Sequence, residues 1–168
     1  MTSDDERRLL RHTVATLAYR AGKVLRDFPP ELAERRVAPA TRTPLELLGH
    51  LGDLADWAAG LARGDPTWRA GPPAPWQAAR LRFFDGLGAL DAELARGAPQ
   101  SRPLPKIFQG PIADALTHVG QLALLRGMLG APLRPESYGR ADIAVGQVGL
   151  DQPPPRAEFD GDASRPAR

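Results

Sequence analysis

TPLELLGHLGDLADWAAGLAR, residues 43–63, is the stretch that most clearly determines the fold. Its leucine and alanine residues recur three and four positions apart, which is the spacing of one face of an α-helix. Thr43 and Glu46 have the spacing of a capping box, and Pro44 between them suits the first helical position. Gly-Asp-Pro follows at 64–66 and is typical of a helix end. We therefore predict an amphipathic helix from Pro44 to about Ala62.

Three further segments, at about 4–28, 75–97 and 110–130, have the same helical period. A capping box at Ser3 and Glu6 precedes the first of them, and two prolines follow it. No stretch alternates apolar and polar residues for long enough to predict a strand. Because each helix has one apolar face to bury, we predict an all-α fold, a four-helix bundle with an irregular C-terminal extension.

Two details of these helices are specific enough to check. In the third helix we expect the core face to carry Trp76, Leu81, Phe84, Leu87, Leu90 and Leu94. In the last helix we expect Pro111 to occupy the first position, because proline lacks the N–H that the first turn leaves unused. Asp114 would then lie in the first turn, where a carboxylate interacts favourably with the helix dipole.

The 168 residues suit one domain. We assign residues 1–132 to the bundle and residues 133–152 to an irregular extension packed on it. Residues 153–168 are rich in proline and charge and poor in apolar side chains. We predict that they form a flexible tail.

Composition excludes several classes of function. The chain has no cysteine, which rules out disulfides, thiolate metal ligands and cysteine nucleophiles. The polar start lacks the apolar segment of a signal peptide, and no apolar run approaches the length of a membrane span. We expect a cytoplasmic protein that binds no membrane. Charges of both signs are interspersed and no basic run exceeds two residues, so we expect no nucleic-acid partner.

Two of the three histidines lie on the apolar faces of different predicted helices. His50 shares its face with residues at 47, 54, 57 and 61, and His118 shares its face with residues at 115, 122 and 125. Both imidazoles should therefore point into the bundle or its mouth. His12 lies among arginines early in the first helix and is expected at the surface.

Asp114 lies four residues before His118, so one helix can present a carboxylate and an imidazole to the same ion. His50 can supply a third ligand from the neighbouring helix, as in metal sites built inside bundles. Two histidines and one carboxylate with open positions suit one divalent metal ion: Zn, Ni, Mn or Fe(II). The alternative is a hydrogen-bonded cluster of core histidines and Asp114 without a metal.

Two further polar residues lie one turn from the histidines. Gln121 can orient a ligand or a bound water, or it can simply be a polar residue at the edge of the apolar face. Asp53 is a candidate base or fourth ligand, but it can equally belong to a solvated helix face shared with Asp56. Tyr138 and Arg140 of the extension could reach the mouth of the bundle or pin a loop.

The segments Leu47-Leu48-Gly49-His50-Leu51 and Asp114 to Gln121 resemble motifs of the DinB/YfiT-like superfamily of four-helix bundles. That family has one histidine in the second helix and an H-x-x-x-H pair in the last bundle helix, often followed by R-G-Q. His50 and His118 match two of these histidines, Asp114 replaces the third, and Gly120-Gln121 match the end of the motif. The resemblance covers about residues 4–130.

The resemblance implies an up-down-down-up bundle, a divalent metal and a homodimer. It also implies a small-molecule substrate, with a low-molecular-weight thiol as the co-substrate of some relatives. The replacement by Asp114 makes the site harder and lowers its net charge by one, which affects the choice of metal.

Three functions are compatible with the sequence. The first is a divalent-metal-dependent enzyme, a thiol-dependent S-transferase or a hydrolase using a metal-activated thiolate or water. The alternative is a non-catalytic bundle, stabilised by the metal or the His/Asp cluster, whose surface mediates dimerisation or partner binding. The third is a sensor for a small ligand. An open cavity beside the three ligands would favour the enzyme.

Overall fold

The computed structural model describes residues 3–97 and 102–160. Its helices, in chain order, are α1 (Ser3–Leu25), η1 (Pro30–Leu32), α2 (Pro44–Arg63), α3 (Trp76–Arg96), α4 (Leu104–Ile107), η2 (Phe108–Ile112), α5 (Ala113–Met128) and η3 (Tyr138–Arg140). The described residues form no β-strand, only an isolated antiparallel bridge between Glu136 and Glu158. The predicted all-α fold is confirmed. Within the same residues, no helix has both the length and the apolarity needed to cross a membrane.

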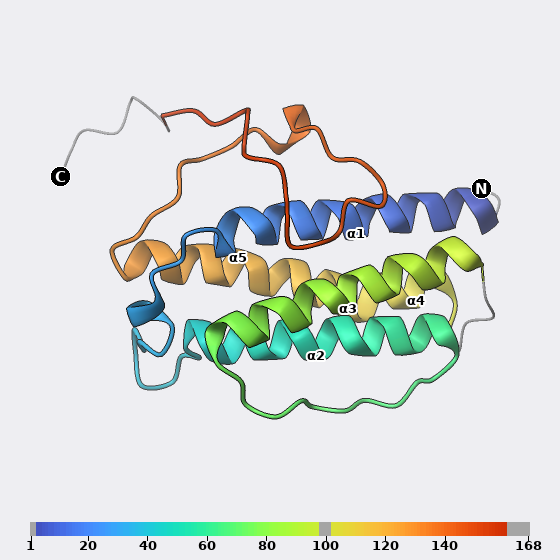
Figure 1. Ribbon diagram of the computed structural model, residues 1–168, viewed down its shortest axis with the longest axis horizontal. Helices are drawn as coiled ribbons and strands as arrows, with labels where there is room; N and C mark the ends of the chain where they lie inside the picture. The colour runs from blue at the N-terminus through green and yellow to red at the C-terminus, as the bar shows by residue number, and fades with distance from the viewer. Residues whose placement is uncertain (1–2, 98–101, 161–168) are drawn as a thin grey trace.

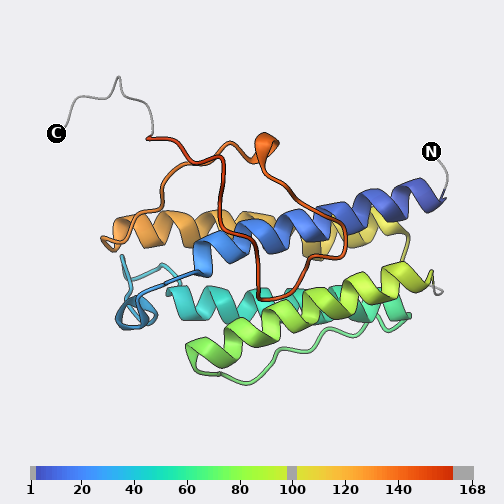
Figure 2. The same cartoon turned by 45° about the horizontal axis from the view of Figure 1, so that its top comes forward.

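The long helices α1, α2, α3 and α5 lie side by side around one apolar core (Figures 1 and 2). Following the colours of Figure 1, α2 and α3 run in the same direction, and α1 and α5 run in the opposite one. α2 packs against α3 and α5, and α1 packs against the same two helices. The largest fully buried side chains are Phe83, Leu17, Leu25, Leu48, Leu51, Leu87, Leu90, Leu94, Ile107, Ile112, Leu122 and Val14.

The capping box predicted for the second helix is confirmed. The Thr43 side chain accepts a hydrogen bond from the Glu46 N–H, and the Glu46 carboxylate accepts one from the Thr43 N–H. Two orphan N–H groups at the helix start are satisfied in this way. Gly64 ends α2 in the left-handed conformation at φ 93°, which glycine adopts without steric cost. The Ser3 side chain, expected to cap α1, lies outside the described side chains.

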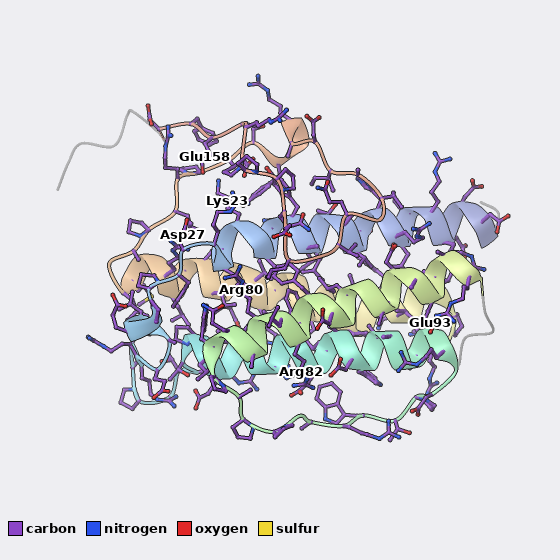
Figure 3. The ribbon with its side chains drawn as sticks, viewed as in Figure 1. Lys23, Asp27, Arg80, Arg82, Glu93 and Glu158 are labelled. Atoms are coloured by element: carbon purple, nitrogen blue, oxygen red, sulfur yellow. The ribbon has the colours of Figure 1, made fainter. Side chains whose placement is uncertain are left out.

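Because α2 and α3 are parallel, the connection between them must return along the whole bundle. Residues 64–75 make this return in an extended path without helix (Figure 1). Arg82 of α3, labelled in Figure 3, is bonded to Asp53 and Asp56 of α2. Asp53 also accepts a hydrogen bond from the Gly71 N–H. These contacts fix the returning loop against α2. Gly86 allows the two helices to approach closely, since a Cβ there would lie 2.7 Å from that of Ala55.

The predicted core face of α3 is wrong at one position. Leu81 is 48% exposed, whereas Phe83 is fully buried. Leu81 lies five residues after Trp76, which places it well away from Trp76 around the helix. Phe83 lies seven residues after Trp76 and therefore shares the buried face.

The end of α1 also differs from the expectation, because the helix ends at Leu25 and not at Phe28. Asp27 has a positive φ of 49°, and Pro29 disfavours helical geometry at the residue before it. The carbonyls exposed by this ending are bonded by the buried Arg126 of α5, which donates to Val24, Arg26 and Asp27. One arginine thus ties the end of α1 to α5.

The predicted start of the last helix is also wrong. The helical segment begins at Leu104, with Pro105 in the first turn, and Pro111 lies inside it. A π-helical turn, η2, surrounds Pro111. A π-turn changes the local register, so it accommodates a residue that has no N–H to donate and would clash in a regular helix. Asp114 lies after this turn, in the first turn of α5 as expected, but the helical segment is continuous from Leu104.

Residues 133–160 form the irregular extension and run over α1 (Figures 1 and 2). The extension crosses α1 at Gly22, where an added Cβ would meet the Gln152 side chain at 2.6 Å. We expected a flexible tail from residue 153. Its described part is held by hydrogen bonds: Pro153 accepts one from Arg26, and the Phe159 N–H donates one to Pro135. Residues 161–168 of the predicted tail lie outside the described residues.

Candidate metal centre

The structure brings His50, Asp114 and His118 together between α2 and α5. One ligand atom from each of them lies within 4.8 Å of the other two, so the group can hold a metal ion. The imidazole rings are 4.9 Å apart and nearly perpendicular. The side chain of His118 is 13% exposed, that of His50 24% and that of Asp114 48%. The group therefore faces solvent on the Asp114 side.

The distances within the group fit coordination better than direct hydrogen bonds. The Asp114 oxygens lie 3.6 Å from Nε2 of His50 and 3.4 Å from Nε2 of His118. A charge-assisted hydrogen bond would be about 2.7–2.9 Å long. Two ligand atoms that each lie about 2.1 Å from the same tetrahedral ion are roughly 3.4 Å apart from each other. The residues present therefore fit a divalent ion.

The outer nitrogen of His118 has its own partner. Nδ1 lies 2.7 Å from Oε1 of Gln121, one turn further along α5. Because Oε1 can only accept, Nδ1 carries the proton and Nε2 of a neutral ring keeps its lone pair. That lone pair faces the Asp114 carboxylate. Two acceptors at this distance repel each other unless a cation, either a proton or a metal ion, lies between them.

His50 is enclosed by aromatic and basic neighbours. The Trp68 ring, from the loop between α2 and α3, lies 5.9 Å from the imidazole, and Trp57 packs edge-on against Trp68 at 5.5 Å. Burial is the main factor that lowers the pKa of His50, and the charges of His118 and Arg42 add to the effect. Asp114 and Asp53 oppose this lowering but do not cancel it. The lowered pKa favours the neutral imidazole, which is the form that binds a metal.

A surface cleft of about 630 Å³ opens directly at the three residues. Its other lining residues are Val37, Ala38, Ala40, Thr41, Arg42, Leu47, Gln121, Leu124, Leu125 and Met128. The cleft lies between α5, the start of α2 and the loop before α2. It is large enough for a small molecule beside an ion. An open cavity beside the three ligand residues, the feature expected to favour an enzyme, is therefore present.

The other residues proposed from the sequence are not part of this group. Asp53, one turn from His50, is half-buried and bonds Arg82 and the Gly71 N–H. His12 is exposed, as predicted. Tyr138 packs against Tyr19 and beneath the guanidinium of Arg20 on α1, so it pins the extension.

Sequence reasoning missed the contribution of the loop before α2. Residues 37–42 form one wall of the cleft, and Arg42 is its cation. The loop has no periodic pattern that would place it, although Arg42 lies directly before the capping residue Thr43. This position could have indicated that Arg42 lies near the site, because a residue just before a helix start lies at the mouth of the bundle.

Comparison with known proteins identified no relative of this chain. No protein-family model matches the chain, and neither the curated proteins nor the solved structures give a match.

Proposed function

We propose that this chain is a divalent-metal-dependent enzyme of the DinB-like type, with His50, Asp114 and His118 as the ligands. Gln121 orients His118 by accepting a hydrogen bond from its Nδ1–H. The ion is Zn, Ni, Mn or Fe(II), the metals suited to two imidazoles and one carboxylate. The reaction is a thiol-dependent S-transfer or a hydrolysis on a small molecule, and the protein acts as a cytoplasmic homodimer.

One observation carries the proposal: three ligand groups converge where a cleft opens. A bound divalent ion would supply Lewis acidity and lower the pKa of a water or thiol beside it. The chain's own residues place the reactants. Leu124, Leu125 and Met128 give the cleft an apolar wall for the body of a substrate, and the exposed Asp114 leaves the ligand group accessible.

The non-catalytic alternative accounts less well for this geometry. A structural metal site is closed by four protein ligands, whereas only His50, Asp114 and His118 come together as possible ligands in the described part of the chain. A metal-free cluster would need direct hydrogen bonds among the three side chains, and the 3.4 and 3.6 Å separations are long for such bonds. Both features favour an ion with an accessible position.

The test is the metal content of untagged full-length protein, measured by mass spectrometry after dialysis against metal-free buffer. We expect about one ion per chain in the wild type, and its loss in Asp114→Ala and in His118→Ala. Asp85→Ala and His12→Ala are matched controls, because each removes an exposed side chain of the same type outside the site. They should keep the ion.

The proposal fails if the wild type holds no stoichiometric metal after addition of Zn, Ni, Mn or Fe(II). It also fails if the two site variants bind the ion as well as the controls do. Once the metal is known, the loaded protein is screened with low-molecular-weight thiols and electrophilic or ester substrates. Turnover that is lost in His118→Ala would support catalysis, and sedimentation of the wild type would test the dimer.

A further inference from the structure

We propose that Arg42 makes the cleft selective for small organic anions, specifically molecules with one carboxylate on an apolar body. The inference rests on the proposed function, since it names the class of substrate that would lie beside the three ligands. It is carried by the position and the unsatisfied charge of Arg42, together with the apolar wall opposite.

Arg42 lies at the junction of two cavities. It lines the cleft beside the ligand group, and it also lines a second cavity of about 620 Å³ on the other side of the α2 start. His50 lines both cavities as well. Arg42 is exposed and lines the same cleft as the three ligand residues, so its side chain is accessible to a ligand there.

The charge of Arg42 has no partner within the part of the chain that the structure describes. Neighbouring arginines differ in this respect. Arg36 is paired with Glu46, and Arg82 is bonded to Asp53 and Asp56. Asp114 is the only carboxylate among the described residues that line the cleft, and it is a proposed metal ligand, so Arg42 is available to bind an anion from solution.

The wall of the cleft on α5 is apolar and uncovered. Leu124 is 63% exposed and Met128 is 61% exposed, and both line the cleft. Exposed large apolar side chains that surround a cavity mark a binding surface more often than isolated ones do. A ligand with a hydrocarbon portion would cover them and gain free energy by removing them from water.

The chemistry of the ligand follows from these two features. A guanidinium binds a carboxylate through two parallel N–H···O hydrogen bonds, which fixes the orientation of the ligand. The guanidinium of Arg42 balances one negative charge on the ligand. The carboxylate of Asp114, which lines the same cleft, would repel a second negative charge. The cleft is therefore suited to a monocarboxylate whose apolar part lies along α5 and whose far atoms reach the ligand group.

The experiment uses octanoate and 1-octanol as probes, titrated by calorimetry into the full-length protein after removal of metal. Metal is removed because an ion would bind the carboxylate itself. We expect the wild type to bind octanoate about tenfold more tightly than octanol, the preference that a charge-assisted hydrogen bond provides. Arg42→Gln should lose this preference, while Arg42→Lys should keep part of it.

Arg63→Gln is the matched control, because it removes the same charge from the exposed opposite end of α2 and should bind octanoate like the wild type. Equal binding of octanoate by wild type and Arg42→Gln would overturn the inference. So would equal binding of octanoate and octanol by the wild type.

Metal content is measured on the same protein batches before the metal is removed, so that the two proposals fail separately. A wild type that holds the ion but shows no preference for octanoate overturns only the anion site. A wild type that prefers octanoate through Arg42 but holds no ion supports the anion site and overturns the metal-dependent function. Circular dichroism confirms that each variant is folded.

Discussion

Oε1 of Gln121 lies 2.7 Å from Nδ1 of His118, on the side of the imidazole that faces away from Asp114. The two residues are three positions apart on α5, so the same helix that presents Asp114 and His118 also presents the acceptor. The contact fixes the proton on the outer nitrogen. It thereby directs the lone pair of Nε2 toward the place where an ion would lie.

Replacing Gln121 by leucine should therefore weaken metal binding without abolishing it. The ligands remain, but the ring of His118 is free to rotate and to carry its proton on either nitrogen. We expect the dissociation constant to rise by about 10- to 100-fold, the usual effect of removing such a partner. Competition with a chromophoric chelator measures it, with Gln109→Leu as the control on η2. Unchanged affinity in Gln121→Leu would contradict the assigned role.

Trp68 should report on metal binding, because its ring lies 5.9 Å from the imidazole of His50. A paramagnetic ion such as Ni²⁺ quenches a nearby indole at short range. Addition of Ni²⁺ should quench the fluorescence of the wild type, and Trp68→Phe should lose most of that quenching. Trp76→Phe is the control, since Trp76 is buried against Phe28. Quenching that persists fully in Trp68→Phe would place the ion elsewhere.

Arg126→Met should destabilise the fold strongly. The guanidinium donates to the carbonyls of Val24, Arg26, Asp27 and Ala131, so four acceptors lose their partner at once. Burial lowers the pKa of Arg126, although Asp27 partly opposes that lowering. We expect a loss of about 3 kcal/mol in the free energy of unfolding. Urea denaturation measures it, and the exposed Arg63→Met should change little.

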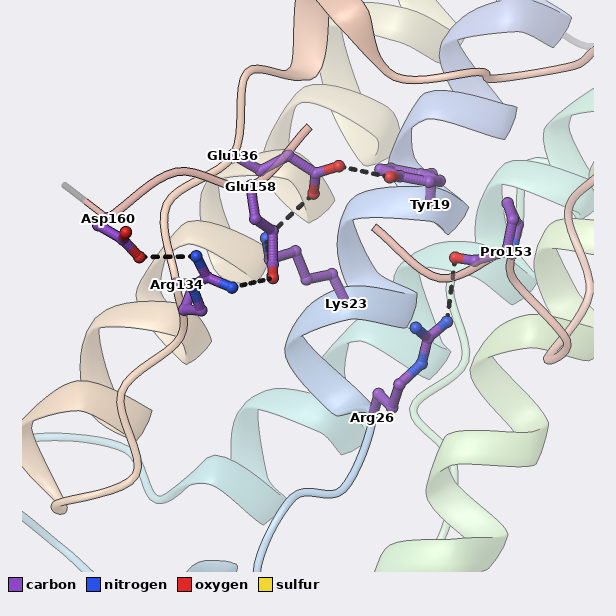
Figure 4. Close-up of polar contacts among 8 residues, drawn as sticks. All are labelled: Tyr19, Lys23, Arg26, Arg134, Glu136, Pro153, Glu158 and Asp160. Atoms are coloured by element: carbon purple, nitrogen blue, oxygen red, sulfur yellow. Dashed lines mark hydrogen bonds and ion pairs between the residues drawn. The ribbon is translucent and has the colours of Figure 1, made fainter. Parts of the chain in front are cut away.

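Glu136 should make stability depend on pH in the acid range. Its carboxylate is buried and accepts hydrogen bonds from Tyr19 at 2.6 Å and from Lys23 at 3.0 Å (Figure 4). Burial alone would raise the pKa of Glu136, but these bonds outweigh it and lower the pKa below its ordinary value of 4.5. On acidification the unfolded chain therefore binds the proton first.

The stabilising contribution of Glu136 is present above about pH 4.5 and is lost as the pH falls through the lower folded value. Denaturant titrations between pH 7 and pH 3 should show this loss in the wild type and a shallower slope in Glu136→Gln. Tyr19→Phe removes one of the two bonds and should give an intermediate slope. Identical slopes in all three proteins would refute the role of the buried carboxylate.

The helices were predictable because their signals are local. The Thr43–Glu46 capping box and the three-and-four spacing after it are properties of adjacent turns, and the start and end of α2 agree with them. The errors also have local causes. At Pro111 the sequence favours a helix start, but the tertiary packing of Ile107 and Ile112 in the core keeps the helix continuous through a π-turn.

The convergence of His50 with Asp114 and His118 was predictable to the extent that apolar faces must meet in the core. Each histidine lies on such a face, and one helical turn separates Asp114 from His118. The distances, the orientation of the rings and the cleft were not predictable, because they depend on how α2 and α5 pack and on the path of residues 37–42.

The sequence by itself determined the helices of this protein, the faces they bury and the residue types that meet at the mouth of the bundle, since hydrophobic periodicity and capping act over a few residues. Only the tertiary structure decided that Arg42 lies in the cleft, that Asp53 is bonded to Arg82, and that the extension is tied to α1 through Lys23 and Glu136. These are contacts between segments distant in sequence. Their formation depends on the packing of the whole chain, which no local pattern encodes.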